Sequence, residues 1–504
     1  MSRSSDTSAG STKIPPNPLR RLVMYVVGGI LLIALVASFV LVLNNDDDAS
    51  QCAEGVERHG PRNECVGLTD GSYLFAPELR DIQAKILAEN NWVLQQGKEY
   101  VNMAYFEPMT LVDNDVTTYQ AVRHGLQGAY LSQRRANRTS EWNGEVPLIR
   151  LLLANPGSQA RQWEPVVDRI VGGQGATDKV VAVAGLGQSI GGTLPAAKRL
   201  SEHKILMVGS VITADHFSDV NHLARVVPTN TNEISAIVEH LKIDTKRAML
   251  VQDINLTDQF ATNLGEVFAN LYPGDGRTLV MPIEEYESSD DDTNNFQRIA
   301  PEICFASPDA IFFAGRFRDL IRFLDVLAQR PCPNLLMRVV TGDTIVDLVN
   351  REDVRRSLAA NIQLKHLHLA YSPAWDGSNN DFFPQRSTEY FTQTGGDGFF
   401  RSEFPNESLD DGLAILAFDA VGTAVSAIRE GNDFTRLHGQ SAVPGASGWI
   451  SLNSGDPDRK AMSLLTLTAA PGDTRTSVQR EVISCSGTPF QPRKQGGPDP
   501  QPCP

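Results

Sequence analysis

Residues 180–217 read VVAVAGLGQSIGGTLPAAKRLSEHKILMVGSVITADHF, and our fold prediction starts from this segment. Two short apolar runs, Lys179–Ala184 and Ile205–Val208, flank a helical pattern over residues 192–201. A strand, a glycine-containing loop, a helix and a second strand in this order are typical of parallel sheets, because a helix connects the parallel strands. The segment therefore predicts an α/β fold.

The same alternation continues on both sides of this segment. Further strands are predicted at Tyr100–Phe106, Leu148–Leu153, Ala248–Gln252, Thr278–Pro282, Ala310–Ala314 and Arg338–Thr341. Helical patterns lie among them at 118–134, 160–171, 232–242, 258–271, 295–304, 316–329 and 344–350. Strict alternation over this length indicates parallel sheets covered by helices, and no period of a repeat protein is present.

The longest apolar run of the chain, Leu22–Leu43, predicts a membrane anchor. Its 22 residues cover roughly 33 Å as a helix, enough for a hydrocarbon core of about 30 Å. Arg20 and Arg21 precede the run and Asp46–Asp48 follow it, so residues 1–21 are expected to be a cytoplasmic tail. We expect a single-pass protein of the cell membrane with an extracytoplasmic main domain. A cleaved signal peptide is the alternative, although its apolar region would be about 7–15 residues long.

The amino-acid composition limits the kinds of partner that the protein is expected to bind. The formal net charge is 45 − 60 = −15, which argues against binding to a phosphate backbone and hence to nucleic acid. Six cysteines lie beyond the anchor and none lies before it or within it, which suits an oxidising exterior. Many pairings are formally open. The simplest set joins neighbours in sequence, as Cys52–Cys65, Cys304–Cys332 and Cys485–Cys503. The sequence contains no CxxC pair of the kind that binds zinc. Neither a metal nor a cofactor is predicted.

Five stretches resemble a known family. They are NMAYFEPMT (102–110) with the segment at 180–217, SPDAIFFAGRFRDLIRFLDVLAQ (307–329), LAILAFDAVGTAVSAI (413–428) and SGWISLNSGDPDRKAMSLLTL (447–467). In this order and spacing they resemble the type I periplasmic-binding-protein fold, and within it the solute-binding family of ABC transporters for branched-chain amino acids and amides. The resemblance covers residues 99–470. It implies two Rossmann-like lobes with parallel sheets, joined by three crossovers, that close on a ligand.

The resemblance also implies a domain layout. We place lobe 1 near 99–229 and 362–445, and lobe 2 near 230–361 and 446–470. Residues 44–98 are predicted to be a stalk and a leading helix, and residues 471–504 a Pro/Gly-rich tail.

Candidate ligand-binding residues follow the predicted strands, because ligands of open α/β sheets lie beyond the carboxyl ends of strands. Gly187 lets backbone N–H groups approach an anion, and Gln188 and Ser189 add side-chain donors. By the resemblance this loop grips a ligand carboxylate; a plain glycine turn is the alternative. Ser210 and Thr213 match the family's hydroxyl cluster, and helix capping is their alternative role.

Three charged residues are candidates from the second lobe. Asp253 and Asp343 end predicted strands, and either carboxylate can pair with a ligand ammonium. Arg316 replaces a smaller residue of the family and favours a further carboxylate or a phosphate; a surface arginine is the alternative. The chain reads LTDQF at residues 256–260, where the family often has Tyr-Gly, so aromatic stacking on the ligand is not expected there.

An enzyme is not predicted. The chain contains no GxSxG, HExxH or P-loop motif, and His366 with His368 supplies too few ligands for a catalytic metal. We expect a membrane-anchored solute-binding protein that captures a small polar ligand, amino-acid-like or amide-like, for an ABC permease. The alternatives are a ligand-sensing receptor that signals to a membrane partner, and a scaffold subunit without a ligand.

Overall fold

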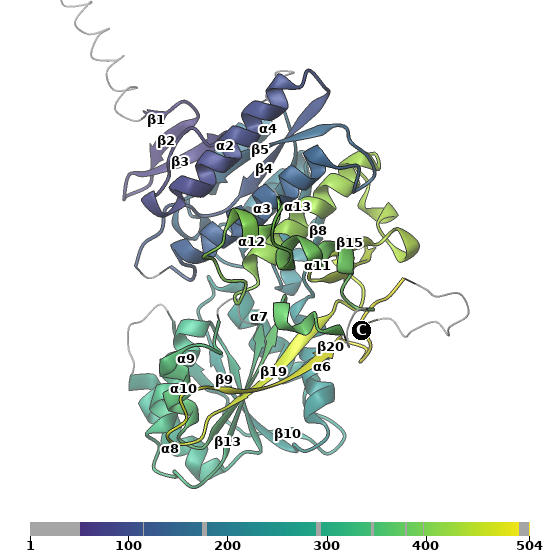
Figure 1. The fold of residues 1–504 in the computed structure, drawn as a ribbon. Coiled ribbons are helices and arrows are strands. Elements are labelled where there is room, and N and C mark those ends of the chain that lie inside the picture. Colours follow the sequence, from purple (N-terminus) through teal and green to yellow (C-terminus); the bar gives the residue numbers. More distant parts are fainter. Residues whose placement is uncertain are drawn as a thin grey trace, which may run out of the picture.

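Two lobes lie end to end in the computed structural model, which describes residues 51–113, 115–173, 179–288, 294–343, 347–377, 381–396, 398–492 and Cys503 (Figure 1). Each lobe is built on one eight-stranded sheet. Buried apolar clusters lie on both faces of each sheet. The predicted tail and anchor, residues 1–21 and 22–43, fall outside the described residues. Within the described ranges, no helix has the length and apolar character that crossing a membrane requires.

Lobe 1 contains the sheet β1-β2-β3-β5-β4-β6-β7-β8. Its strands are β1 (Gln51–Ala53), β2 (Val56–His59), β3 (Glu64–Thr69), β4 (Tyr100–Phe106), β5 (Leu148–Asn155), β6 (Val180–Gln188), β7 (Leu206–Val211) and β8 (Leu223–Arg225). Its helices are α2 (Arg80–Gln95), α3 (Tyr119–Arg138), α4 (Trp163–Gly172), α5 (Thr193–Glu202), α11 (Gln385–Thr392), α12 (Phe400–Glu403) and α13 (Leu413–Arg429), with the short turns η2 (Ser158–Ala160) and η3 (Asp215–Phe217). Strands β4 to β8 are parallel, whereas β1 to β3 are antiparallel.

Lobe 2 contains the sheet β10-β9-β12-β13-β14-β19-β20, with β11 also paired to β9. Its strands are β9 (Arg247–Asp253), β10 (Thr278–Leu279), β11 (Glu284–Tyr286), β12 (Ala310–Ala314), β13 (Met337–Asp343), β14 (Ile362–His368), β19 (Met462–Thr468) and β20 (Ser477–Ile483). Its helices are α6 (Asn230–Leu241), α7 (Gln259–Leu271), α8 (Asn294–Ala306), α9 (Phe317–Ala328) and α10 (Glu352–Leu358). The chain passes between the lobes after β8, after β14 and before β19.

The N-terminal part of the described chain is not the predicted stalk. Strand β3 pairs with β5 and extends the sheet of lobe 1, and α2 packs on α3 and β5. Residues 51–98 therefore belong to the lobe. The prediction of a stalk is wrong for residues 51–76, whereas the predicted leading helix is present as α2 and packs on the lobe. Strands β1 to β3 are short, with the sequences QCA, VERH and ECVGLT, so they are too short to show the apolar alternation that would have revealed them.

Three further elements differ from the prediction. Strand β14 pairs with β13 and β19 in the second sheet and therefore belongs to lobe 2. We predicted that lobe 1 resumes near residue 362, at the start of this strand, but the chain returns to lobe 1 only after it. Strand β20 lies in the predicted tail, 471–504, and forms the edge of the same sheet next to β19. The helix predicted at 344–350 is absent from 347–350, and α10 begins at Glu352; residues 344–346 are outside the described part.

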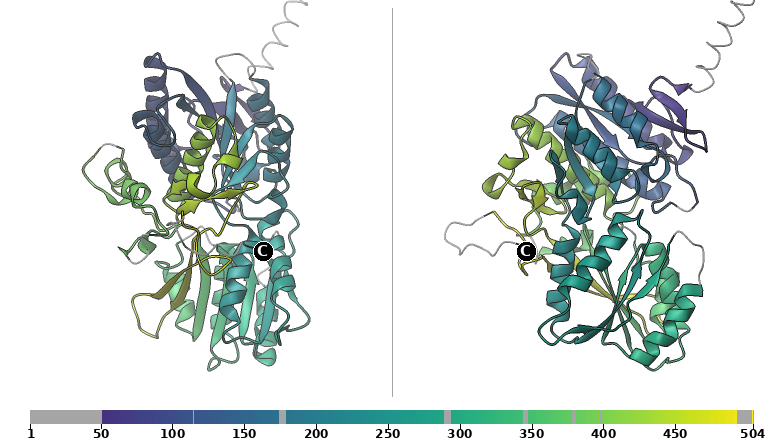
Figure 2. Two further views of the ribbon diagram at one scale, coloured as in Figure 1. Left: turned by 90° about the vertical axis from the view of Figure 1, so that its right-hand side faces the viewer. Right: turned by 180° about the vertical axis from the view of Figure 1, so that it is seen from behind.

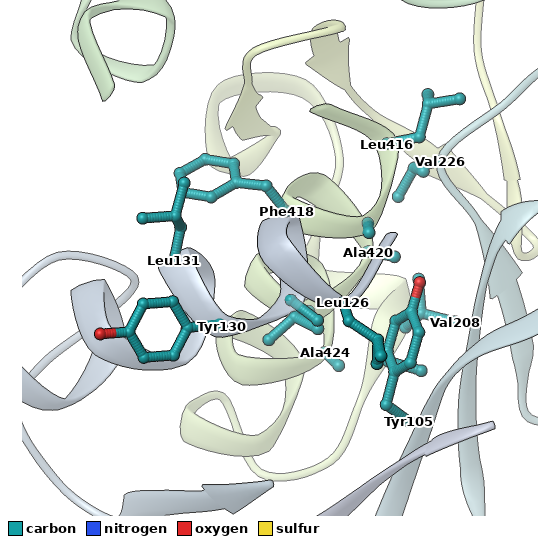
Figure 3. Packing of buried hydrophobic residues seen from close by; sticks show 14 of the residues in the cluster. Tyr105, Leu126, Tyr130, Leu131, Val208, Val226, Leu416, Phe418, Ala420 and Ala424 are labelled. Carbon is teal, nitrogen blue, oxygen red and sulfur yellow. The ribbon is translucent and has the colours of Figure 1, made fainter. Parts of the chain in front are cut away.

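Helix α13 completes the core of lobe 1 from far along the sequence. It is buried along most of its length and packs on α3, and Figure 3 shows Ala420 and Ala424 beside Leu126. The two backbones come so close that a Cβ at Gly128 would lie 1.9 Å from the Ala414 carbonyl oxygen. Only glycine fits this position.

One carboxylate on α13 fixes the chain that returns to lobe 2. Asp419 is buried and accepts hydrogen bonds from the backbone N–H groups of Ala446 (2.7 Å) and Ser447 (2.8 Å). Lys460 Nζ donates to Ser447 Oγ at 2.8 Å. The small β15–β16 ribbon (Val443–Gly445, Gly448–Ile450) and the β17–β18 ribbon (Leu452–Asn453, Asp456–Pro457) follow along this return path.

The three predicted disulfides are confirmed, as Cys52–Cys65, Cys304–Cys332 and Cys485–Cys503. The first ties β1 to β3. The last holds the C-terminal end of the chain, which lies beside the junction of the lobes in both views of Figure 2. The disulfide bonds are thus distributed over both lobes.

Asn90 tests whether α2 is an integral part of lobe 1. Its amide is buried, donates to the Leu151 carbonyl oxygen (2.7 Å) and accepts from the Leu151 N–H (2.8 Å). We expect Asn90→Ala to lower the free energy of unfolding of the 51–504 fragment by about 3 kcal/mol, because these buried groups lose their partner. Asn91, exposed on the same helix, provides the control: Asn91→Ala should change little. Urea denaturation measures both. Equal losses in the two variants would show that α2 is only loosely attached.

Candidate functional site

The candidate site lies between the lobes, where loops that follow parallel strands of both sheets meet. An outer cavity of about 200 Å³ opens there. From lobe 1 it is lined by Asp115, Val116, Gln159, Arg161, Ile190 and Gly191, and from lobe 2 by Asn255, Thr257, Asp258, Ser288, Arg316, Phe317, Arg318 and Asp319. The lining is strongly charged, with both signs present.

A second cavity of about 20 Å³, called the inner cavity here, also lies between the lobes. Gln188, Val211 and Thr213 line it from lobe 1, and Phe260, Arg316, Phe317 and Asp343 from lobe 2. A water molecule needs roughly 10–15 Å³, so in this conformation the inner cavity has room for about one. Arg316 and Phe317 belong to both linings and separate the two cavities.

Arg316 contacts both lobes. It stands at the start of α9, where its Nε and Nη2 donate to the two carboxylate oxygens of Asp258 at 2.7 and 2.8 Å. Its Nη1 also donates to Gln188 Oε1 (2.8 Å), and its Nη2 to the Ser189 carbonyl oxygen (3.3 Å), across the cleft. The guanidinium carbon lies 4.5 Å from the centre of the Phe260 ring. Asp258 therefore holds the Arg316 guanidinium in place. The hydrogen bonds that this guanidinium does not make to Asp258 go to lobe 1.

The loop opposite Arg316 has an unusual backbone. Gly185, Leu186 and Gly187 have φ values of 90°, 66° and 63°. The pairing of β6 with β7 shifts register between Gly185 and Gln188, as in a β-bulge. The predicted strand end at Ala184 is therefore followed by a bulged continuation to Gln188, and this bulge presents the Gln188 side chain and the Ser189 carbonyl to the cleft.

The structure brings four of the eight predicted residues to the inner cavity, namely Gln188, Thr213, Arg316 and Asp343. Gly187 and Ser189 are their neighbours in the bulged loop; Ser189 contributes its carbonyl oxygen, while its hydroxyl accepts from the Ala214 N–H at 3.4 Å.

Ser210 and Asp253 are not among the residues that line the two cavities. The Ser210 hydroxyl donates to the Gly185 carbonyl oxygen at 3.3 Å. Asp253 Oδ1 accepts from the N–H groups of Asn255 and Ser288, both at 3.0 Å, and burial raises the pKa of Asp253. The side chains of Ser210 and Asp253 therefore bind the backbone of the loops that form the site, and neither lines a cavity.

Sequence reasoning missed three residues of this site. Asp258 caps α7, accepting from the Ala261 N–H at 3.1 Å, while its carboxylate also binds Arg316. Phe260 lines the inner cavity, so an aromatic ring is present where the sequence comparison led us not to expect stacking. Glu233, on α6, is fully buried and its Oε2 accepts from the Asp343 N–H at 3.0 Å. The helical pattern of 232–242 hides Glu233, because a single glutamate on an amphipathic helix is ordinarily exposed.

Buried acids dominate the electrostatics of lobe 2 at the cleft. Burial raises the pKa of Asp343 and of Asp319 to about 6. Burial and the nearby charge of Asp343 raise the pKa of Glu233 well above its usual range. Among the described residues, no group of three or more His, Cys, Asp or Glu side chains is placed to hold a metal ion. The chemistry that the site offers is ionic and hydrogen-bonded recognition.

Comparison with known proteins finds no matching family model and no curated protein with a similar sequence. Solved structures do match. A leucine binding protein from Thermotoga maritima aligns with a TM-score of 0.55 at 18% identity, covering 76% of this chain and 98% of its own. A branched-chain amino acid transporter substrate binding protein from Streptococcus pneumoniae, in complex with isoleucine, aligns with a TM-score of 0.55 at 16% identity, covering 76% and 100%.

A solute binding protein of an ABC transporter from Rhodopseudomonas palustris, in complex with 3,4-dihydroxybenzoic acid, aligns with a TM-score of 0.55 at 15% identity, covering 78% and 98%. At these identities the likeness concerns the fold. The two lobes of this chain have the fold of type I periplasmic binding proteins, as the solute-binding proteins of ABC transporters do.

Proposed function

We propose that this chain is a membrane-anchored, extracytoplasmic solute-binding protein that captures a small carboxylic acid between its lobes for an ABC-type importer. The observation that carries the proposal is the position of Arg316. Its guanidinium stands between the two cavities, faces the bulged loop of lobe 1, and is held by Asp258 at 2.7 and 2.8 Å. A planar guanidinium with N–H groups in a fixed fork is suited to a carboxylate.

The ligands of the matching structures support a carboxylate. Isoleucine is bound in one of them, leucine in another and 3,4-dihydroxybenzoic acid in a third, and each of these molecules carries one carboxyl group. In this chain, a carboxylate that enters between Arg316 and the loop 187–189 would replace Gln188 Oε1 and the Ser189 carbonyl as the acceptor for the guanidinium. The N–H groups of the loop would face it from the other side.

Closure is the second part of the proposal. The lobes touch directly: the Gly191 N–H donates to the Thr257 carbonyl oxygen at 3.0 Å, and the Phe260 N–H donates to the Ser189 carbonyl oxygen at 3.2 Å. Together with Arg316 these bonds hold the lobes closed around cavities that are small for a ligand. Ligand entry requires an open state, and the observed affinity depends on how much of the protein occupies the competent state.

The anchor and the partner are inferred from the sequence. Residues 22–43 supply the anchor, and the fold supplies a binding domain without a catalytic motif, so the proposal includes no enzymatic step. A ligand-sensing receptor, or a scaffold subunit, is the second candidate. The small inner cavity favours the scaffold, because direct contacts between the lobes already fill much of the cleft.

A thermal-shift screen of the 51–504 fragment tests the proposal. Small carboxylic acids, including amino acids and hydroxybenzoic acids, are compared with their primary amides. We expect at least one acid, but not its matched amide, to raise the melting temperature, because a ligand that binds only the folded state stabilises it by about 2.7 kcal/mol at a hundredfold excess over its Kd. A cooperatively melting protein with no response to any acid would favour the scaffold.

Arg316 is predicted to hold the lobes closed in the absence of ligand. Arg316→Ala removes two hydrogen bonds to lobe 1, which at about 2 kcal/mol shifts the equilibrium toward the open form by roughly thirtyfold. Small-angle X-ray scattering should then give a larger radius of gyration. Arg322→Ala is the control on the same helix, since Arg322 lies 3.6 Å from Asp319 of its own lobe. The same radius in both variants would show that Arg316 does not hold the lobes together.

Thr213 and Ser210 separate ligand contact from loop support. We expect Thr213→Val to weaken the binding of the best acid about tenfold, since it removes one hydroxyl from the inner cavity. Ser210→Ala should leave the Kd within about twofold, because the Ser210 hydroxyl is bound to the Gly185 carbonyl behind the loop. Isothermal titration calorimetry measures both. If Ser210→Ala weakened binding more than Thr213→Val, the ligand would lie beside Ser210 and not in the inner cavity.

A further inference from the structure

Two buried histidines, one from each lobe, bind the same loop. His124 lies on α3 in lobe 1 and His368 ends β14 in lobe 2, and only 1% and 2% of their surfaces are exposed. The loop consists of residues 407–412 and leads into α13. His368 directly precedes the crossover that carries the chain back to lobe 1, so this loop lies where the two lobes are joined.

Both ring nitrogens of His124 face carboxylates. Nδ1 lies 2.5 Å from Asp411 Oδ2, and Nε2 lies 3.0 Å from Glu407 Oε2. A carboxylate only accepts hydrogen bonds, whereas a neutral imidazole carries a proton on one nitrogen alone. Both contacts are hydrogen bonds only if His124 is an imidazolium ion. Burial lowers the pKa of His124, but the hydrogen bonds and charges of Asp411 and Glu407 raise it by more, so this pKa lies above its usual range.

The hydrogen bonds of His368 have a different pattern. Its Nε2 lies 2.8 Å from the Asp410 carbonyl oxygen, which can only accept. Its Nδ1 lies 3.3 Å from the backbone nitrogen of Ala370, whose N–H group can only donate. The partners of a histidine ring determine which nitrogen carries the proton. His368 is therefore a neutral imidazole with its proton on Nε2, and burial lowers its pKa.

The charges around the two rings agree with one charged and one neutral histidine. Glu407 is an ionised acceptor for His124, because Arg123 donates to its two oxygens at 2.8 and 3.2 Å. Arg401, on α12, donates to the Glu407 carbonyl oxygen at 3.2 Å. Backbone groups bind both nitrogens of His368, so the nearby acids act on it through their charge. The titratable groups near His368 are His366 on the same strand, Tyr371, Asp347, Asp410 and Asp411.

The loop contacts the two histidines through adjacent residues. Asp411 binds His124, and Gly412 follows with a φ of 73°. A Cβ at Gly412 would lie 2.8 Å from the Ala370 carbonyl oxygen and 3.1 Å from His368 Cε1. The loop is therefore packed directly on the crossover between the lobes. If Asp411 moves away from His124, Gly412 moves away from His368 with it.

We propose that His124 and His368 together set the pH range in which loop 407–412 holds the two lobes together. His124 acts as a cation, so the loop is released when pH rises and the imidazolium gives its proton to the solvent. His368 acts as a neutral ring, so the junction weakens when pH falls and Nδ1 gains a proton that faces the Ala370 N–H. The inference goes beyond the proposed function and requires no ligand.

The pH dependence of unfolding tests the pair. An unperturbed histidine titrates near about 6.5. The contribution of His124 to stability is complete below that pH and is lost as pH rises through its raised pKa. The contribution of His368 is present above that pH and is lost as pH falls through its lowered pKa.

Urea denaturation of the 51–504 fragment, which contains both lobes, measures these contributions. We expect the urea midpoint of His124→Gln to lie below that of the wild type, and the difference to shrink between about pH 6.5 and 9. For His368→Gln the difference should shrink between about pH 6.5 and 5. His438 is exposed, and His438→Gln is the control that should follow the wild type throughout. Differences that stay constant with pH in both variants would overturn the proposal.

NMR of the fragment with ¹⁵N-labelled histidine reports the protonation states. At pH 7.5 we expect protons on both ring nitrogens of His124 and on Nε2 alone of His368, assigned from the signals that each glutamine variant removes. Asp411→Asn keeps the shape of the loop but removes one negative charge, so the His124 signal should titrate at a lower pH. This shift identifies His124 even if His124→Gln does not fold. A neutral His124 at pH 7.5 would contradict the proposal.

Hydrogen exchange tests whether the loop holds the lobes together. At pH 7 we expect His124→Gln to exchange amide hydrogens about tenfold faster than the wild type at residues 407–412 and also at 368–371, because both segments open together. His438→Gln should show neither change. Faster exchange confined to 407–412 would show that the state of His124 does not reach the junction, and the proposal would then be wrong.

Discussion

The packing of α13 against α3 is the constraint from which the rest of the architecture follows. Lobe 1 cannot close its core with the residues before 229 alone, because the face of its sheet beside α3 is covered by a helix that begins at Leu413. The chain must therefore leave lobe 1, build the second sheet and come back. Asp419 then holds the segment that leads the chain to β19, and this return leaves the carboxyl ends of both sheets facing one cleft.

The fold was largely predictable where the sequence is periodic. Buried parallel strands such as β4, β9 and β12 are continuous apolar runs, and the helices between them alternate with clear turns, so their existence and type follow from pattern. Strands β1 and β20 are edge strands, and β2 and β3 follow β1 at the same end of the first sheet. All four carry polar residues, so their pairing depends on tertiary contacts that a local pattern does not contain. The border at β14 was misplaced for a similar reason, because the sheet to which a strand belongs is decided by its neighbours.

The candidate site was only partly predictable. Gln188, Thr213, Arg316 and Asp343 could be predicted because they follow strand ends. The loops after parallel strands of an α/β sheet lie close together, so residues in these loops are expected to meet. Asp258 and Glu233 escaped, because their roles arise from burial and from contacts with residues distant in sequence. The bulge at Gly185–Gln188 also could not be predicted from two glycines alone, although it places a carbonyl oxygen and an amide side chain against Arg316.

Folding of residues 51–98 into lobe 1 has a mechanical consequence. Between the end of the proposed span at Leu43 and the start of β1 at Gln51, seven residues remain, which extend over about 25 Å at most. If residues 22–43 form the proposed anchor, such a tether would keep the antiparallel end of lobe 1 beside the bilayer and leave lobe 2 as the lobe that moves. A protein held this way does not search the compartment as a free carrier; it samples only membrane partners within its reach, at a high local concentration.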